Sequence, residues 1–301
     1  MRKYLLITIF ILTKVAFAEG LSTVKIGNIG DDYTNLIIKA IDKNLQEYGY
    51  TAISEVAISH QENINKLISG KISTAFIPLD IAATNLINDP KEKLLLIGGK
   101  VVPKVFFCVA YKGSDIKTYA DLIANNTVLK IFVGDKNGAT DRTFQHLTQL
   151  NPKLQNFKLY YESKTKIELN RLLSGRRDLV CFISVPDPNN ELIKMVMGHG
   201  ELLFITINQP DFITAKIGKI RLYDILEIPV SNGFLGFNQK KVKTLVTWLS
   251  IVANEEQMEK QLLDSLTSVV MQPDLFLSQS FAYKIKQFFD ITIKEIKKIA
   301  K

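Results

Sequence analysis

The sequence predicts an α/β fold of two doubly wound domains, joined by a hinge, with a ligand cleft between them and a helical C-terminal tail. Apolar runs of strand length alternate with helical patterns of one to three turns, which is typical of parallel sheets covered by helices. This alternation fills two successive blocks of the chain, residues 21–105 and 112–226. Two extended runs, at 106–111 and 233–238, bracket the second block and would connect the domains as a hinge.

The first block begins with an expected strand at 24–29 that ends at Gly30. Asp31 and Asp32 then supply the N-cap and first-turn residues of a helix. That helix is expected to stop at Gly49, because glycine readily takes the left-handed conformation of a C-cap. The remaining elements expected in this block are strands at 50–58, 73–79 and 94–102, a short helix that ends at Gly70, and a helix that begins near Asp80.

The second block is organised around a glycine-bounded loop at 134–139 that opens a helix at about Thr140. Such a loop presents free backbone N–H groups and the positive end of a helix dipole, which together bind carboxylates and phosphates. The expected strands are 106–111, 128–133, 157–161, 178–184 and 201–207, and the other helices are 118–124, 166–174 and 189–197.

After a strand at 233–238, the tail is expected to be almost entirely helical. Pro273 separates a helix at 255–270 from a terminal helix that begins near Ser278. The terminal helix is basic and carries an apolar stripe at helical spacing. This pattern favours packing on a domain over binding to a membrane surface.

The first eighteen residues are predicted to be a signal peptide. Arg2 and Lys3 precede an apolar run at 5–12, and Ala16-Phe17-Ala18 supplies a small-x-small cleavage site. The apolar run is too short to span a bilayer. We therefore expect export to the periplasm with cleavage after Ala18. The mature chain would form domain 1 from residues 19–111 and 231–301, and domain 2 from residues 112–230.

Composition excludes several classes of function. The formal charge is +8, and removal of Arg2, Lys3 and Lys14 with the signal peptide leaves 8 − 3 = +5, which is spread along the chain. No basic cluster is interleaved with aromatic residues, so a nucleic-acid partner is not expected. Cys108 and Cys181 lie in apolar strand-like runs of different domains. An exported chain could pair them, but the sequence favours two buried thiols that are not bonded to each other.

No enzyme signature is present. The chain lacks G-x-S-x-G, H-E-x-x-H and the phosphate-binding G-x-x-x-x-G-K-[ST]. His60, His146 and His199 are expected at helix starts or surface turns, without a carboxylate or cysteine at the spacing of metal ligands. We therefore expect no catalytic residue, no metal and no cofactor.

Four strand-to-helix turns, at 27–33, 77–80, 134–140 and 184–189, are expected to face the cleft. Each carries small or hydrogen-bonding residues where backbone and side chains can meet a ligand. The alternative for each single turn is an ordinary capped turn. The candidate ligand-binding residues in these turns are Asn28, Tyr33, Asp80, Asn137, Thr140 and Asn189.

The two walls of the cleft have different expected chemistry. The 134–140 loop is predicted to bind an anionic group through its backbone and the Thr140 hydroxyl. Asp31 or Asp32 on the other wall would meet a positive or donor group. An amino-acid-like zwitterion would satisfy both walls.

The sequence resembles a known family in five segments. The central segments AYKGSDIKTYADL and VGDKNGATDRTF are similar to the signature of type II periplasmic solute-binding proteins, and most like the TAXI receptors of TRAP transporters. Three other segments fit the same pattern, namely GKISTAFIPLDIA, SGRRDLVCFISVPDPNNELIK and SNGFLGFNQKKVKTLVTWL, so the resemblance covers nearly all of the mature chain. By this resemblance Tyr33, Asp80, Gly138, Ala139 and Thr140 would border the ligand.

The resemblance implies a monomeric receptor that captures a small polar solute, an amino acid or a carboxylate, by domain closure. It would deliver that solute to the membrane subunits of a TRAP-type transporter. Three alternatives stay open: a receptor for an ABC importer, an exported binding or sensor protein, and an exported enzyme of the same fold.

Overall fold

The computed structural model describes residues 21–88, 94–125, 127–155, 157–232 and 238–272. The expected signal peptide, the strand at 233–238 except for its last residue, and the terminal helix near Ser278 lie outside the described residues. Among the helices that are described, none has the length and apolar character needed to cross a membrane.

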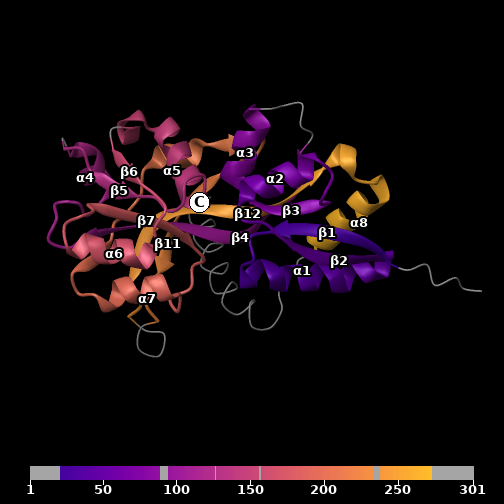
Figure 1. Ribbon diagram of the computed structural model, residues 1–301, viewed down its shortest axis with the longest axis horizontal. Coiled ribbons are helices and arrows are strands. Elements are labelled where there is room, and N and C mark those ends of the chain that lie inside the picture. Colours follow the sequence, from indigo (N-terminus) through magenta and orange to yellow (C-terminus); the bar gives the residue numbers. More distant parts are fainter. Residues whose placement is uncertain (1–20, 89–93, 126, 156, 233–237, 273–301) are drawn as a thin grey trace, which may run out of the picture.

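The chain forms a mixed α/β fold, as the sequence predicted, in which one ten-stranded sheet runs through both halves of the molecule (Figure 1). The strand order is β2-β1-β3-β12-β4-β7-β5-β6, with β11 paired to β12 and β8 paired to β4. Of the strands that the structure describes, only β4 and β12 extend along both halves, so they join them.

The first half is built from parallel strands and the helices that connect them. Strand β1 pairs in parallel with both β2 and β3. The expected start and stop signals work as predicted: Asp31 caps the first helix, and Gly49 has a φ of 85° after a final 3-10 turn. The elements are β1 (Ser22–Asn28), α1 (Asp32–Leu45), β2 (Tyr50–Val56), α2 (His60–Ile68), β3 (Thr74–Pro78) and α3 (Leu79–Asn88).

The two joining strands correct the sequence analysis. The strands expected at 94–102 and 106–111 are a single strand, β4 (Leu94–Tyr111). Residues 241–254, expected to be helical, form strand β12 (Lys241–Asn254), which pairs antiparallel with β4. Most of β12 is buried on both faces, so its sequence lacks the alternation of a half-exposed strand and its apolar run can be mistaken for a buried helix.

The second half repeats the parallel arrangement, with β5 paired to both β6 and β7. Strand β11, which follows a small β9–β10 hairpin (Lys216–Ile217 and Ile220–Arg221), was not expected from the sequence. The elements of the second half are α4 (Tyr119–Ala124), β5 (Lys130–Phe132), α5 (Ala139–Leu150), β6 (Lys158–Tyr160), α6 (Thr165–Leu173), β7 (Leu179–Ser184), α7 (Glu191–Gly198), β8 (Leu202–Phe204) and β11 (Tyr223–Pro229). Helix α8 (Lys260–Val270) lies within the helix expected at 255–270 and packs against α1 and β4 of the first half.

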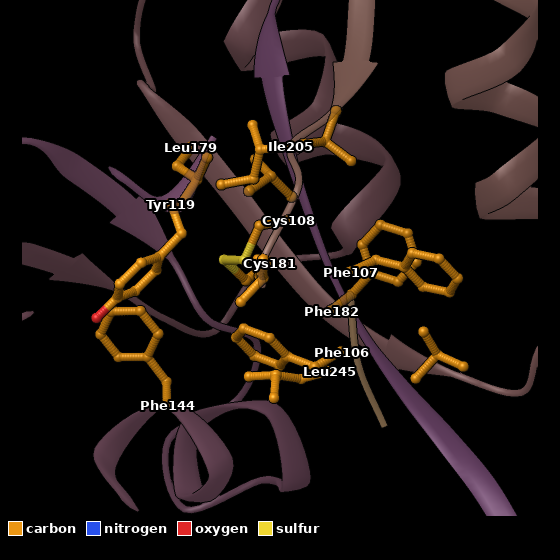
Figure 2. Packing of buried hydrophobic residues seen from close by; sticks show 14 of the residues in the cluster. Phe106, Phe107, Cys108, Tyr119, Phe144, Leu179, Cys181, Phe182, Ile205 and Leu245 are labelled. Carbon is orange, nitrogen blue, oxygen red and sulfur yellow. A yellow bond between two sulfur atoms is a disulfide. The ribbon is translucent and has the colours of Figure 1, made fainter. Parts of the chain in front are cut away.

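The prediction that Cys108 and Cys181 are not bonded is wrong. Strand β4 continues into the second half and pairs with β7, which places the two cysteines directly opposite each other. Their Cα atoms are 4.1 Å apart and their sulfur atoms are bonded at 2.10 Å. Figure 2 shows this disulfide within the apolar core of the second half, beside Phe107 and Phe182.

Candidate functional site

A cavity of about 600 Å³ lies between the start of α2 in the first half and the start of α5 in the second. Each of these helices follows the end of a sheet strand, which is where open α/β sheets bind their ligands. The first half contributes Ile29, Ile58, Ser59, His60, Gln61, Glu62 and Asn65, and the second contributes Asp135, Lys136, Asn137, Gly138, Ala139 and Arg142.

The wall formed by α2 is capped by its own side chains. The Ser59 hydroxyl accepts a hydrogen bond from the N–H of Glu62 at 3.1 Å, and the Glu62 carboxylate accepts from the N–H of Ile58 at 2.8 Å. Lys66 forms an ion pair with the same carboxylate at 3.1 Å. The N–H bond from Ile58 and the contact with Lys66 hold the pKa of Glu62 below its usual range. The charge of Glu62 is therefore already matched within α2.

His60 is the buried polar side chain of this wall. The imidazole is only 6% exposed, and its Nδ1 lies 3.3 Å from the carbonyl oxygen of Phe76 in β3. Burial, with a smaller contribution from the Lys104 ammonium, lowers the pKa of His60 to about 4. The ring is therefore neutral at physiological pH.

The wall formed by α5 presents backbone groups. Gly138 is the N-cap and has no side chain to cap the helix, so the first N–H groups of α5 are left for another acceptor. A Cβ at position 138 would lie 2.9 Å from the Asp135 carbonyl oxygen, so this close turn requires glycine. Asp141, in the first turn of α5, is fully buried and accepts hydrogen bonds from the N–H of Asn137 at 2.7 Å and from Gln145.

Arg142 gives the α5 wall its charge. Its side chain is half-buried one turn into α5, and within the described part of the chain its guanidinium has neither an ion pair nor a hydrogen-bond partner. Lys136 adds a second positive charge, and Asp135 offsets one of the two. The helix N-terminus and the guanidinium act in the same sense, since both favour an anion.

A second, smaller cavity of about 140 Å³ lies between α3 and α5, and Arg142 lines it as well. Asp80 faces this space but is 1% exposed and fully engaged. One carboxylate oxygen accepts from the N–H of Ile81, and the other accepts from the hydroxyls of Thr143 at 2.5 Å and Tyr223 at 3.0 Å. Asp80 therefore ties α3 of the first half to α5 and β11 of the second.

His146 extends this network. It lies inside α5, not at a helix start or surface turn as expected, and its Nδ1 is 2.8 Å from the Tyr223 oxygen. Because Tyr223 donates its proton to Asp80, Nδ1 of His146 must donate to Tyr223. Burial lowers the pKa of His146, and the Asp80 charge opposes that change. Burial and Asp80 both raise the pKa of Tyr223.

A second contact between the halves joins the first turn of α1 to the turn before α7. The Tyr33 hydroxyl donates to the Asp187 carboxylate at 3.3 Å. Burial and the neighbouring Asp187 raise the pKa of Tyr33 to about 12. Asp31, two residues before Tyr33, is the N-cap of α1; it accepts from the N–H of Thr34 and pairs with Lys104 of β4 at 3.6 Å.

Of the residues predicted to bind the ligand, three line the larger cavity: Asn137, Gly138 and Ala139. The others are placed elsewhere, and their role in binding stays a prediction. The buried Asn28 bonds to Gly30 and Ser54, Asp32 is exposed on α1, Thr140 accepts a hydrogen bond from the N–H of Ile183, and Asn189 accepts one from Asn232.

Sequence reasoning missed His60, Gln61 and Arg142. The four strand-to-helix turns expected at the cleft do not include the turn after β2, although this turn and the start of α2 supply most of the first wall. It weighed His60 only as a metal ligand or base, and no group of three or more metal-binding side chains occurs in the described ranges. The detectable signal was positional: His60 lies two residues after the strand expected at 50–58, and Arg142 lies four residues after the Gly138 cap.

Comparison with known proteins identifies the fold. No protein-family model and no curated protein matches the chain. The structure is similar to the substrate binding protein of an amino acid ABC transporter, with a TM-score of 0.52 and 13% identity, covering 89% of this chain and 100% of that one. At this identity the likeness establishes the two-domain fold of a binding protein.

Two further solved structures are more distant. They are the P235GK mutant of ArgBP from T. maritima, with a TM-score of 0.49, 14% identity and coverage of 89% and 96% of the two chains, and the periplasmic aliphatic sulphonate binding protein SsuA from Escherichia coli, with a TM-score of 0.48, 14% identity and coverage of 83% and 72%.

Proposed function

We propose that the protein is an exported, non-enzymatic receptor that captures a small polar solute between its two halves. The observation that carries this proposal is the cavity whose walls come from α2 on one side and α5 on the other. A solute held there contacts both halves and so stabilises their closed arrangement. The fold shared with the substrate binding protein of an amino acid transporter supports the same role.

The cavity favours an amino acid or another small carboxylate. Arg142 and the N-terminus of α5 would hold the anionic group, because a guanidinium and free backbone N–H groups both bind carboxylates. Asn137, Gly138 and Ala139 belong to this anion-binding wall. The first half would contact the remainder of the solute through α2.

Delivery to a membrane transporter is the second part of the proposal. The predicted signal peptide favours the periplasm, and the buried Cys108–Cys181 disulfide fits an oxidising compartment. The resemblance to TAXI receptors favours a TRAP-type transporter. The structural similarity to the substrate binding protein of an amino acid ABC transporter makes an ABC importer the alternative partner.

The receptor function can be tested on native protein. Periplasmic protein purified without refolding should carry a small molecule detectable by native mass spectrometry. Replacing Arg142 with alanine should abolish that retention, whereas replacing the exposed Arg221 of β10 should leave it unchanged. Absence of any retained solute, together with an Arg142→Ala protein that matches the wild type in thermal shifts against amino acids and small carboxylates, would reject the proposal.

Trp248 offers an independent signal of domain closure. It is the single tryptophan, is 2% exposed, and donates from Nε1 to Asp224 at 2.7 Å. It lies in β12 opposite Pro103 of β4, in the two strands that join the halves. Movement of the halves on solute binding should therefore change the fluorescence of Trp248.

A further inference from the structure

We infer that His60 selects solutes that carry a hydrogen-bond donor, by offering its Nε2 lone pair as an acceptor in the larger cavity. This inference rests on the proposed receptor function and narrows its substrate class to carboxylates that also carry a hydroxyl or ammonium group. It assigns to His60 a role in specificity that is separate from the anion-binding wall of α5.

The tautomer of His60 follows from its partner. Nδ1 lies 3.3 Å from the carbonyl oxygen of Phe76, and a carbonyl oxygen only accepts hydrogen bonds. Nδ1 must therefore carry the proton in this contact. In a neutral imidazole the other nitrogen, Nε2, is then the acceptor.

The surroundings keep the ring neutral and Nε2 available. His60 begins α2, so the positive end of the helix dipole opposes protonation, as do burial and the nearby Lys104. Lys104 is itself paired with Asp31 at 3.6 Å. His60 lines the cavity, and among the described residues Nε2 has no hydrogen-bond partner. Its lone pair is thus left for a solute.

His60 is the fixed acceptor on this wall. The Glu62 carboxylate is engaged by Ile58 and Lys66 within its own helix. Gln61 donates to Asn65 at 3.3 Å, and its amide can rotate to present either its NH₂ donor or its carbonyl acceptor to the cavity. The imidazole of His60 is instead anchored to β3, so the wall presents the same acceptor to every solute that enters.

The geometry separates two requirements of a solute. The α5 wall, with Arg142, takes the carboxylate, and a bare carboxylate satisfies it. The α2 wall leaves the Nε2 lone pair of a buried side chain unmatched unless the solute brings a donor. An unmatched buried acceptor costs about 1–3 kcal/mol, so solutes without a donor should bind roughly five- to a hundred-fold more weakly.

Two variants of His60 test the acceptor role. In His60→Asn, the amide nitrogen takes the place of Nδ1 and can still donate to Phe76, but nothing replaces Nε2. In His60→Gln, the longer side chain reaches the position of Nε2 and its carbonyl can accept, while the bond to Phe76 is lost. The pair therefore separates the acceptor from the structural contact.

The probes are L-leucine, 2-hydroxy-4-methylpentanoate and 4-methylpentanoate, which share a carboxylate and a carbon skeleton and differ only in an ammonium, a hydroxyl or a hydrogen. Calorimetric titration of the wild-type mature chain at pH 7 should give at least about five-fold tighter binding of the first two. His60→Asn should lose that preference, and His60→Gln should retain part of it.

Equal affinity of the wild type for all three probes, or an unchanged preference in His60→Asn, overturns the inference. So does a co-purified solute that has no donor, or binding of none of the probes by a protein that does carry a solute. In these cases the receptor function stands. If no solute is retained and Arg142→Ala matches the wild type, the receptor function fails as well.

Discussion

The interface between the halves uses polar residues in two opposite ways. In the direct contacts, Asp80 and Tyr33 join the halves, through Thr143 and Tyr223 in one contact and through Asp187 in the other. At the cavity, α2 and α5 face each other across about 600 Å³. There, Arg142 and Nε2 of His60 have no partner among the described residues.

This difference explains why residue type alone is a poor guide to the site. Asp80 looks like a ligand-binding residue in the sequence, yet three donors already occupy its carboxylate. Buried polar groups are almost always paired, so a buried carboxylate tends to meet protein donors first. The groups left over for a solute are the ones whose protein partners are missing, and pairing is a property of the fold.

Removal of the disulfide should have the largest effect on stability. It fastens β4 to β7 in the second half, and the cysteines are 73 residues apart in sequence. Replacing Cys108 and Cys181 with alanine should lower the free energy of unfolding by about 4 kcal/mol, because the unfolded chain regains the entropy of that loop. Guanidinium denaturation measures this change.

Neither cysteine lines the α2–α5 cavity, so solute affinity should fall far less than stability. The control is the wild-type chain kept reduced during the same denaturation, which should behave like the double variant. Two titratable thiols in unfolded protein that was never exposed to reductant would contradict the bond itself.

The sequence was most informative about local structure. Glycine stops and aspartate caps located α1 correctly, since such signals act within one turn of the chain. It failed for β12, because a strand buried on both faces has no alternation of apolar and polar residues. It also failed for the disulfide, because the pairing of Cys108 with Cys181 depends on the register of two distant strands.

The candidate site divides in the same way. The glycine cap of α5 was predicted from the sequence, and Gly138 lines the cavity. The opposite wall was expected at Asp31 and Asp32, but most of it comes from the start of α2 and the turn before it. Which strand-to-helix turn faces α5 depends on how the halves are joined through β4 and β12, and no local pattern encodes that arrangement.

Acid should destabilise the protein through His60, on the cavity side of the interface. The pKa of His60 is lowered from 6.5 to about 4 in the folded state, so folding favours the neutral ring. This contribution is complete above pH 6.5 and is lost as the pH falls toward 4. It amounts to roughly 3 kcal/mol, measurable as the difference in unfolding free energy between pH 7 and pH 4.

His60→Asn should remove most of that difference, because an amide does not titrate. The exposed His199 provides the matched control, and His199→Asn should keep the wild-type dependence on pH. An acid dependence in His60→Asn equal to that of the wild type would show that other groups cause the loss of stability.

Asp80→Asn tests the direct contacts between the halves. The amide keeps the size of the side chain but turns one acceptor into a donor that faces the hydroxyls of Thr143 and Tyr223. We expect a loss of about 2 kcal/mol in thermal or chemical unfolding. Because the same bonds hold the halves together, solute affinity should fall by no more than about thirty-fold. Asp32→Asn, at an exposed position of α1, should change stability by about 0.5 kcal/mol or less. Unchanged stability with a large loss of affinity would mean that Asp80 contacts the solute and that the comparison between the direct contacts and the cavity is wrong.

Tyr33→Phe should have the smallest effect. The variant removes one hydrogen bond between the halves, the 3.3 Å contact with Asp187, from a side chain that is only half-buried. Such a bond contributes about 1 kcal/mol or less to the closed arrangement, so solute affinity should fall no more than about five-fold. Calorimetry of this variant beside Tyr48→Phe, which alters an exposed tyrosine of the first half, isolates the contact.

The pKa of Tyr33 is raised from 10.0 to about 12, so the bond is complete below pH 10 and is lost as the pH rises toward 12. The difference between wild type and Tyr33→Phe should therefore be constant from pH 7 to pH 9 and shrink above pH 10. A loss of affinity well beyond ten-fold at pH 7 would place the Tyr33 hydroxyl on the solute itself, since one half-buried hydrogen bond between the halves is too weak to account for it.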